Sequence, residues 1–326
     1  MKFVAIDSPF IKDSYLKKIQ GFGEITEFIS YPDRPETTEE IIDRIGDADI
    51  ITLDIFVTLD KQILEQCINL KAIFCQAVGF NNIDVEYAQK KGIKVYNCAG
   101  YNAIAVAEFV FALITSLFRK IPAAQEHVRA GGWMYRYFEG RELSGKTIGI
   151  IGAGNVAKKV LKIAQGYDMK TLVQTLSPSP KRAQALGIKN FSSLSEVLKK
   201  SDIVMLSVPL TSSTKHLIGK KELSKMKSDA ILVNTSRQTV VDEMALAEAI
   251  VENRIGGAVL DVILTEPFYL KDQPILIQEM INLPNVIVTP HIAGVSEESS
   301  VYLGEIFVSN IRNFIQGDLT NCVNCT

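Results

Sequence analysis

The sequence predicts an α/β protein made of two doubly wound domains, each built on a parallel sheet. Two observations predict this fold class: short apolar runs alternate with amphipathic segments along most of the chain, and one long apolar segment divides the alternation into two series. The length agrees, because 326 residues, 47% of them hydrophobic, exceed one ordinary core. We place one domain at 1–100 plus 296–326 and the other at 101–295.

The first series contains four apolar runs that read as strands, namely Phe3–Ile6, Ile50–Leu53, Ala72–Cys75 and Ile93–Tyr96. Between them lie segments with the spacing of amphipathic helices, at 38–45, 61–68 and 85–91. Strands that alternate with helices pair in parallel, because each helix carries the chain back to the same end of the sheet.

The long apolar segment, 102–119, predicts a buried helix that separates the two series. A second series of strands begins at 147–151 and continues to Val288. The last helix is expected at 297–315, closed by Gly317. It comes after every strand of the second series, so we expect it to pack back on the first domain.

Composition argues for small-molecule chemistry. The formal net charge is -2, which leaves no basic surplus for a nucleic acid, and no lysine-rich run marks a membrane surface. The helix at 102–119 carries Glu108 and is too short and polar to span a bilayer. The first residues read as a strand rather than a signal peptide, so we expect a cytoplasmic protein without nucleic-acid or membrane partners.

The chain has five cysteines, an odd number, which fits reduced thiols in a cytosolic protein. The last two, Cys322 and Cys325, have metal or redox spacing. Because no second pair and no histidine lies near them in the sequence, we favour an incidental tail and predict no metal site.

A glycine-rich turn joins the strand 147–151 to the next predicted helix. Gly152 permits the tight turn, Gly154 lets the backbone approach a pyrophosphate, and the helix that begins near Asn155 and Val156 presents its amides and its dipole to the charge. In this strand–turn–helix context the pattern predicts a dinucleotide-binding, Rossmann-type domain.

The expected acid at the end of the following strand, which would bind the adenosine ribose, is missing. Thr175 stands there, followed by Ser177, Lys181 and Arg182, while Asp168 comes too early. Hydroxyls and cations without a carboxylate tolerate a 2'-phosphate, so we lean towards NADP over NAD. The alternative, left open, is a solvated loop whose two cations start the next helix.

Three polar groups follow apolar runs of the second series. Arg237 follows 230–234, Glu266 follows 257–261, and His291 follows 285–288. Carboxyl ends of parallel strands share one edge of the sheet, so these groups predict a proton-transfer site with an anion clamp. The alternative is a hydrogen-bonded loop histidine beside a surface ion pair.

With these motifs in order, the chain resembles the D-isomer-specific 2-hydroxyacid dehydrogenase family over nearly its whole length. The resemblance is carried by six segments: Val78–Asp84, Ala105–Glu108, Gly152–Ala157, Asn234–Glu243, Leu260–Pro267 and Pro290–Gly294. It departs from the family pattern at Ala157, Gln238 and Thr175, and the last departure bears on cofactor choice.

The resemblance implies a flavodoxin-like substrate domain, a homodimer, and hydride transfer between NAD(P)(H) and a small 2-oxo or 2-hydroxy acid such as glyoxylate or hydroxypyruvate. It implies that Arg237 binds the substrate carboxylate, that His291 is the acid/base, and that Glu266 is its partner. Val78 and Gly79 would receive the carboxylate as well. Around the cofactor it places, besides the turn and the loop after Thr175, the residues Val208, Pro209, Thr214, Thr235, Ser236, Asp261 and Gly294.

Two alternatives stay open. The aromatic segment with Trp133, Tyr135, Tyr137 and Phe138 is a subunit contact or a pocket lid, or it packs in the core, which we favour. A dinucleotide-sensing scaffold or corepressor of the same fold is the rival to the enzyme, and consumption of reduced cofactor with 2-oxo acids separates the two.

Overall fold

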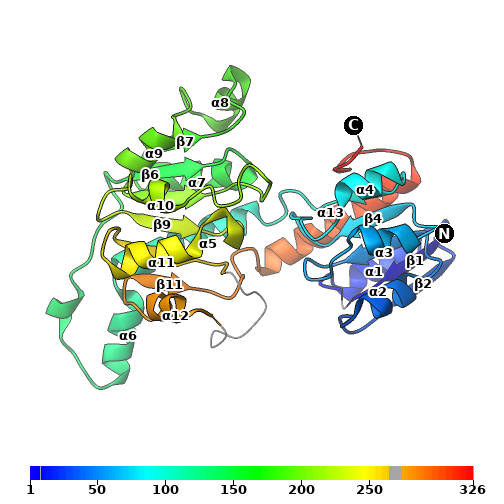
Figure 1. Ribbon diagram of the computed structural model, residues 1–326, viewed down its shortest axis with the longest axis horizontal. Coiled ribbons are helices and arrows are strands. Elements are labelled where there is room, and N and C mark those ends of the chain that lie inside the picture. Colours follow the sequence, from blue (N-terminus) through cyan, green and yellow to red (C-terminus); the bar gives the residue numbers. More distant parts are fainter. Residues whose placement is uncertain (8, 264–272, 326) are drawn as a thin grey trace. The chain divides into compact units, whose positions relative to one another are not determined.

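A computed structural model describes residues 1–7, 9–263 and 273–325 (Figure 1). The chain divides into two compact units: unit 1 is Met1–Asn102 with Val295–Thr326, and unit 2 is Ala103–Gly294. Each unit contains a sheet whose strand pairs are all parallel. The predicted fold class is therefore confirmed.

The sheet of unit 1 has the order β2-β1-β3-β4-β5, which is the flavodoxin order. Its strands are β1 (Lys2–Ala5), β2 (Glu27–Ser30), β3 (Ile50–Leu53), β4 (Ala72–Cys75) and β5 (Lys94–Tyr96). Strand β2 is not among the strands predicted from the sequence. It lies at the edge of the sheet and its side chains are half-buried or exposed, so it lacks the apolar run of an inner strand.

Alternate side chains of each inner strand of unit 1 enter different layers. Phe3 and Ala5 pack towards α1 (Asp13–Gln20) and α13 (Glu297–Ile315). Val4 and Ile6 pack on the other face, which is covered by α2 (Thr38–Ile45), α3 (Lys61–Gln66) and α4 (Val85–Lys90). The last long helix is thus part of the first sheet's cover.

The sheet of unit 2 has the order β11-β10-β9-β8-β6-β7. Its strands are β6 (Thr147–Ile151), β7 (Lys170–Gln174), β8 (Ile203–Leu206), β9 (Ile231–Asn234), β10 (Gly257–Leu260) and β11 (Val286–Val288). The first strand lies inside the sheet, so the strand order reverses between β6 and β8. In open α/β sheets that reversal opens a crevice at the carboxyl ends of the strands, where ligands bind.

Both faces of this second sheet are apolar, as a buried parallel sheet requires. In β8, for example, Ile203 and Met205 face α5 (Ala103–Phe118) and α7 (Asn155–Gly166). Val204 and Leu206 face the opposite layer, made of α9 (Leu194–Lys200), α10 (Lys220–Leu223), α11 (Glu243–Val251) and α12 (Ile275–Ile281). One more helix, α8 (Pro180–Leu186), follows β7.

An arm formed by α6 (Ile121–Arg129) and the 3-10 helix η1 (Tyr135–Phe138) extends from unit 2 (Figure 1). None of the residues in these two helices is buried. Between and within them, Trp133 is 88% exposed and Tyr135 is 78% exposed. The preference for core packing of this aromatic segment is therefore wrong, since the arm leaves its rings in solvent.

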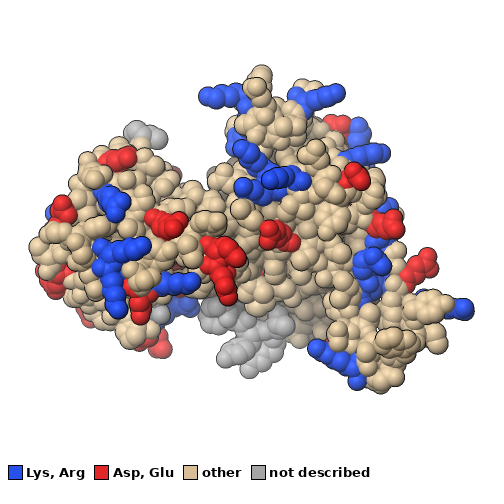
Figure 2. Space-filling model, turned by 180° about the vertical axis from the view of Figure 1, so that it is seen from behind, with Lys and Arg blue, Asp and Glu red and all other residues tan. Residues whose placement is uncertain are grey.

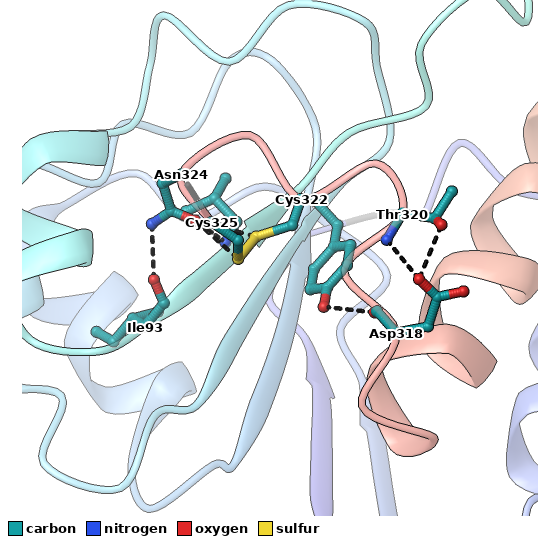
Figure 3. Close-up of a disulfide and its surroundings, with 8 residues drawn as sticks. Ile93, Asp318, Thr320, Cys322, Asn324 and Cys325 are labelled. Carbon is teal, nitrogen blue, oxygen red and sulfur yellow. Dashed lines mark hydrogen bonds between the residues drawn. A yellow bond between two sulfur atoms is a disulfide. The ribbon is translucent and has the colours of Figure 1, made fainter.

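The chain's tail carries a disulfide between Cys322 and Cys325 (Figure 3). The expectation of reduced thiols is wrong for this pair, because residues three apart meet across one tight turn beside β5. The other three cysteines, Cys67, Cys75 and Cys98, are free and buried. Among the described residues, no helix is both long and apolar enough to cross a membrane.

Candidate active site

The turn between β6 and α7 can be built only with glycine at its first position. Gly152 has φ 112°, in the region that side chains rarely adopt, and a Cβ there would collide with the backbone carbonyl of Ser207. Its amide donates to the carbonyl of Gln174 at 2.9 Å. The turn therefore sits tightly between the ends of β7 and β8, at the point where the strand order reverses.

Gly154 has a different function in the same turn. It is the N-cap of α7, and no atom lies within 4 Å of the place where its Cβ would stand. The first turn of α7, which begins with Asn155 and Val156, contains no acidic residue. Open space at a helix N-terminus with free positive dipole fits the pyrophosphate of a dinucleotide.

The loop after β8 flanks this turn. Val208 lies beside Gly152, within 3.1 Å of its would-be Cβ. Thr214 is buried, and its hydroxyl donates to the carbonyl of Pro209 at 2.6 Å and accepts from the amide of Thr211 at 2.8 Å. Thr214 therefore fixes the shape of the loop from within.

The loop after β7 carries the residues that bear on cofactor choice. Thr175 follows the strand, and α8 begins with its N-cap Ser179, whose side chain accepts from the amide of Arg182. The guanidinium of Arg182 reaches back to the carbonyl of Ala153, 3.4 Å away, while Lys181 is exposed. Lys and Arg side chains gather at this end of unit 2 (Figure 2). One of the two cations is thus directed to the glycine turn.

The catalytic candidates follow three neighbouring strands whose ends are aligned. Asn234 at the end of β9 pairs with Leu260 of β10, which pairs with Val288 of β11. Arg237 and His291 each come three residues after the paired ends of β9 and β11. Because β10 lies between them, β9 and β11 are two strand spacings apart, about 10 Å, so both side chains start from one short stretch of the sheet's edge.

The loop that carries Arg237 is shaped by Asn234. The buried Asn234 side chain donates to the carbonyl of Arg237 at 2.9 Å. Its oxygen accepts from the amide of Ser236 at 3.0 Å and from the Ser236 hydroxyl at 2.8 Å. Thr235 lies half-buried inside this turn. The turn fixes the backbone from which the guanidinium projects.

The loop that carries His291 is fixed by Asp261. This residue is only 1% exposed, and its carboxylate accepts from the Thr289 hydroxyl at 2.6 Å and from the amides of Ile292 at 2.9 Å and Ala293 at 2.8 Å. The amide of His291 donates to the Asp261 carbonyl at 2.9 Å. Both carboxylate oxygens of Asp261 are thus bonded to the histidine loop, which continues to the half-buried Gly294.

His291 has φ 55°, in the left-handed region, and its residue is half-buried. Such a conformation is uncommon for residues other than glycine, and it persists where surrounding bonds determine it. Here the bonds from Asp261 on both sides of the residue do so. Glu266, the predicted partner of His291, lies outside the described residues.

In unit 1 the loop after β4 carries Val78 and Gly79. The Val78 side chain is exposed, and its carbonyl accepts from the side chain of Asn97 at 2.7 Å, while the amide of Cys98 donates to Ala77 at 2.9 Å. These bonds hold the loop's carbonyls towards β5. Three supporting residues, Asn97, Asn234 and Thr289, received no role from the sequence. Each is a small polar residue that ends an apolar strand or directly follows one, and this is the signal that could have found them.

The carboxyl edge of unit 1 also holds Asp7. Its Oδ2 accepts from the amide of Asp54 at 2.8 Å, and its Oδ1 is buried without a hydrogen-bond partner. Burial, opposed by that hydrogen bond and reinforced by the Asp54 charge, raises the pKa of Asp7 from 3.8 to about 7. The folded protein therefore retains a proton that the unfolded chain releases near pH 4.

We expect the free energy of unfolding to fall as pH rises from about 4 to 7, because the folded state binds more protons than the unfolded state over that range. Asp7→Asn keeps an acceptor for the Asp54 amide and removes the charge. The parent should lose about 4 kcal/mol of unfolding free energy over this range, because its pKa is raised by about three units and each unit is worth about 1.4 kcal/mol, whereas the variant should lose none of it. Urea unfolding from pH 4 to 8 measures this, and equal slopes in both proteins would contradict it.

Comparison with known proteins decides the family. Residues 111–293 match the family that is described as the NAD-binding domain of D-isomer specific 2-hydroxyacid dehydrogenases. The glyoxylate reductase of Thermococcus litoralis is 36% identical over 322 residues, which cover 96% of this chain and 94% of that protein. The chain belongs to the D-isomer-specific 2-hydroxyacid dehydrogenase family.

Two solved structures resemble the whole of this dehydrogenase. One is an acyclic imino acid reductase in complex with NADPH and D-Arg, 34% identical with a TM-score of 0.87 over 99% of both chains. The other is the D-lactate dehydrogenase of Aquifex aeolicus with NAD and lactic acid, 28% identical with a TM-score of 0.86 over all of both chains. The protein is thus an NAD(P)-dependent D-2-hydroxyacid dehydrogenase that transfers hydride between a nicotinamide and a small 2-oxo or 2-hydroxy acid.

Proposed function

We propose that this dehydrogenase reduces glyoxylate or hydroxypyruvate with NADPH. The observation that carries the proposal is the aligned end of β9 and β11, from which Arg237 and His291 start close together. The similarity to an archaeal glyoxylate reductase over nearly the full length of both proteins supports the choice of substrate. Glyoxylate, with two carbons, is the smallest molecule that offers both a carboxylate for the clamp and a carbonyl for the proton donor.

In this proposal each residue has one task. The Arg237 guanidinium binds the substrate carboxylate through two parallel hydrogen bonds and polarises the adjacent carbonyl. The His291 imidazolium gives its proton to the carbonyl oxygen, and the Glu266 carboxylate stabilises that imidazolium. Val78 and Gly79 receive the carboxylate through backbone amides. The dinucleotide, held by Gly152, Gly154, Asn155 and Val156, supplies the hydride when bound.

A substrate panel tests this proposal. We expect oxidation of NADPH with glyoxylate and hydroxypyruvate to exceed that with bulkier 2-oxo acids at least tenfold in kcat/KM. The panel includes each oxo acid with ammonium, because the 34% identical structure is that of an imino acid reductase. If the protein oxidises no reduced cofactor with any of these acids, the result would support the rival interpretation, a dinucleotide-sensing scaffold or corepressor.

The preference for NADPH rests on the loop after β7. No carboxylate stands at Thr175 to bind a ribose diol or to repel a 2'-phosphate. Arg182 is directed to the glycine turn through its bond to Ala153, and Ser177 and Lys181 supply a hydroxyl and a second cation on the same loop. An anionic 2'-phosphate would meet two positive side chains there.

We expect Arg182→Ala to weaken NADPH binding by about tenfold, since a hydrogen bond between charged groups contributes about 1.5 to 3 kcal/mol. NADH binding should change less than threefold. Lys189→Ala, which removes a lysine beyond the end of α8, is the matched control and should change neither. Thr175→Asp should shift preference towards NADH. A parent enzyme at least tenfold better with NADH would show that the loop assignment is wrong.

We propose that the protein is a homodimer that uses the α6–η1 arm. The arm exposes Trp133, Tyr135 and Tyr137, and a large aromatic surface of this kind is typical of subunit contacts. The visible face of the arm is mostly uncharged (Figure 2). A cytoplasmic location is part of the proposal: three of the five cysteines are free, and the reducing cytosol would act on the Cys322–Cys325 disulfide.

We expect sedimentation at micromolar concentration to give a dimer for the parent and a monomer for the double variant Trp133→Ala, Tyr135→Ala. Tyr302→Ala, which removes a half-exposed aromatic side chain from α13 in unit 1, is the control and should remain dimeric. A monomeric parent at this concentration would refute the dimer, and a dimeric arm variant would move the contact elsewhere.

A further inference from the structure

The tail after α13 is bound to β5 like a short additional strand. Cys322 forms an antiparallel bridge with Tyr96, and the amide of Val323 donates to the carbonyl of Val95 at 2.8 Å. The buried side chain of Asn324 forms the two hydrogen bonds that the backbone of a neighbouring strand would form: its oxygen accepts from the Val95 amide at 2.9 Å and its nitrogen donates to the Ile93 carbonyl at 2.8 Å. The position of the tail therefore depends on the conformation of the turn Cys322–Cys325, which carries these bonds.

The Cys322–Cys325 disulfide closes that turn into a ring (Figure 3). Both cysteines are only half-buried, whereas Cys67, Cys75 and Cys98 are buried, so this pair is the more exposed to an external thiol. The remaining cysteines are inert by comparison, because burial raises the pKa of the Cys67 thiol to about 11 and that of Cys75 to about 12. Of the chain's cysteines, only this pair is placed for exchange with an external thiol.

A row of asparagines connects the tail with the loop of Val78. The carbonyl of Asn321, next to Cys322, accepts from the Asn97 amide at 3.4 Å, and its side chain donates to Asn310 at 2.8 Å. The fully buried Asn310 donates to the Asn97 carbonyl at 2.9 Å. The Asn97 side chain in turn donates to the Val78 carbonyl at 2.7 Å. Each link lies inside unit 1.

We propose that the Cys322–Cys325 pair is a thiol–disulfide exchange site at which a dithiol reductant releases the tail from β5 and weakens substrate binding through Asn97 and Val78. The second half of this statement rests on the proposed contact of Val78 and Gly79 with the substrate carboxylate. The first half stands independently of any enzyme activity.

The exchange is balanced by the reductant. A thiolate of the dithiol attacks one sulfur of the Cys322–Cys325 bond, and the other sulfur leaves as a thiolate and takes a proton. The second thiol of the reductant then displaces the bound cysteine from the mixed disulfide. Two electrons and two protons reach the protein, which ends with two thiols, and the reductant ends as its own disulfide.

Opening the ring removes the constraint that keeps the turn in the conformation β5 requires. The bonds of Val323 and Asn324 to β5 then exchange with water, and the carbonyl of Asn321 no longer holds Asn97. We expect the amides of Val95 and Val323 to exchange hydrogen at least about tenfold faster after reduction, as for other segments that open locally.

The test uses dithiothreitol and the full chain in three measurements. Alkylation of the unfolded protein counts thiols by mass, with three expected before reduction and five after it. Hydrogen exchange then follows Val95, Val323 and Asn97. Finally, the KM for glyoxylate should rise by about threefold or more on reduction while kcat changes less than twofold, a coupling of ordinary size.

Two variants sharpen the test. The double variant Cys322→Ser, Cys325→Ser should behave as reduced protein with or without dithiothreitol. Asn97→Ala removes the link to Val78, so its thiol count and the exchange at Val323 should still respond to dithiothreitol while its KM should not. A disulfide that resists millimolar dithiothreitol, or a KM that stays constant while five thiols form, would overturn the proposal. If no 2-oxo acid is reduced, the proposed function fails, and thiol counts with hydrogen exchange still decide the exchange site.

Discussion

His291→Asn should lower turnover of the 2-oxo acid by about 10²- to 10⁴-fold, because the variant lacks the proton donor at the carbonyl oxygen and general acid catalysis has that magnitude. Asparagine is the informative replacement. His291 has φ 55°, and asparagine tolerates the left-handed region better than alanine does, so the loop should keep its shape. Binding of the reduced dinucleotide, measured by fluorescence, should change less than threefold, since the glycine turn is untouched.

A matched control is available in the same unit. His216 also has a left-handed backbone, with φ 50°, and it is exposed in the loop between β8 and α10. His216→Asn should therefore repeat the conformational effect of His291→Asn without the chemical one, and turnover should stay within twofold of the parent. If His291→Asn retains more than a third of the parent's turnover across the pH range, His291 is not the acid.

The sequence predicted the strand ends that carry the candidate site, because the physics that forms them is local. An apolar run of four residues makes a buried strand, and the residues directly after a parallel strand must lie at the sheet's carboxyl edge. The strand ends before Arg237, Asp261 and His291 were therefore predictable, and so was the need for glycine at position 152. The family resemblance identified the chemistry, and comparison with known proteins confirmed the family and the enzyme class.

The features that the sequence did not predict depend on contacts between distant segments. Edge strand β2 has only two apolar residues, Phe28 and Ile29, which pack on opposite faces of the sheet, and its two end residues are exposed. The arm around Trp133 has the aromatic content of a core segment, and only the structure shows that it extends away from one. The disulfide of the tail depends on a turn that is held by β5, a strand far earlier in the chain. One of the bonds that join the two segments, from the Tyr96 hydroxyl to the Asp318 carbonyl, connects residues 222 positions apart. Asp261 is the most consequential of these cases.

Family resemblance places Asp261 near the nicotinamide, but its carboxylate is buried and accepts three hydrogen bonds from the loop of His291. Asp261→Asn keeps the size of the side chain and replaces one acceptor by a donor. That donor would face the amide of Ala293 or that of Ile292, so one buried N–H would lose its partner. We expect the free energy of unfolding to fall by about 3 kcal/mol, the scale of a lost hydrogen bond to a buried charge.

We expect the turnover of folded Asp261→Asn to fall by about 10²-fold, because a displacement of about 1 Å in a catalytic group has that effect. This loss would come in addition to the loss of stability. Asp202→Asn is the control. Asp202 accepts from the amide of Thr147 at 2.7 Å and pairs with Lys227 at 2.8 Å, at the opposite end of the same sheet. The Asp202→Asn variant should be less stable than the parent but should keep the parent's turnover at a temperature where both variants are folded. Equal turnover in the two variants would mean that Asp261 supports the fold alone and does not position His291.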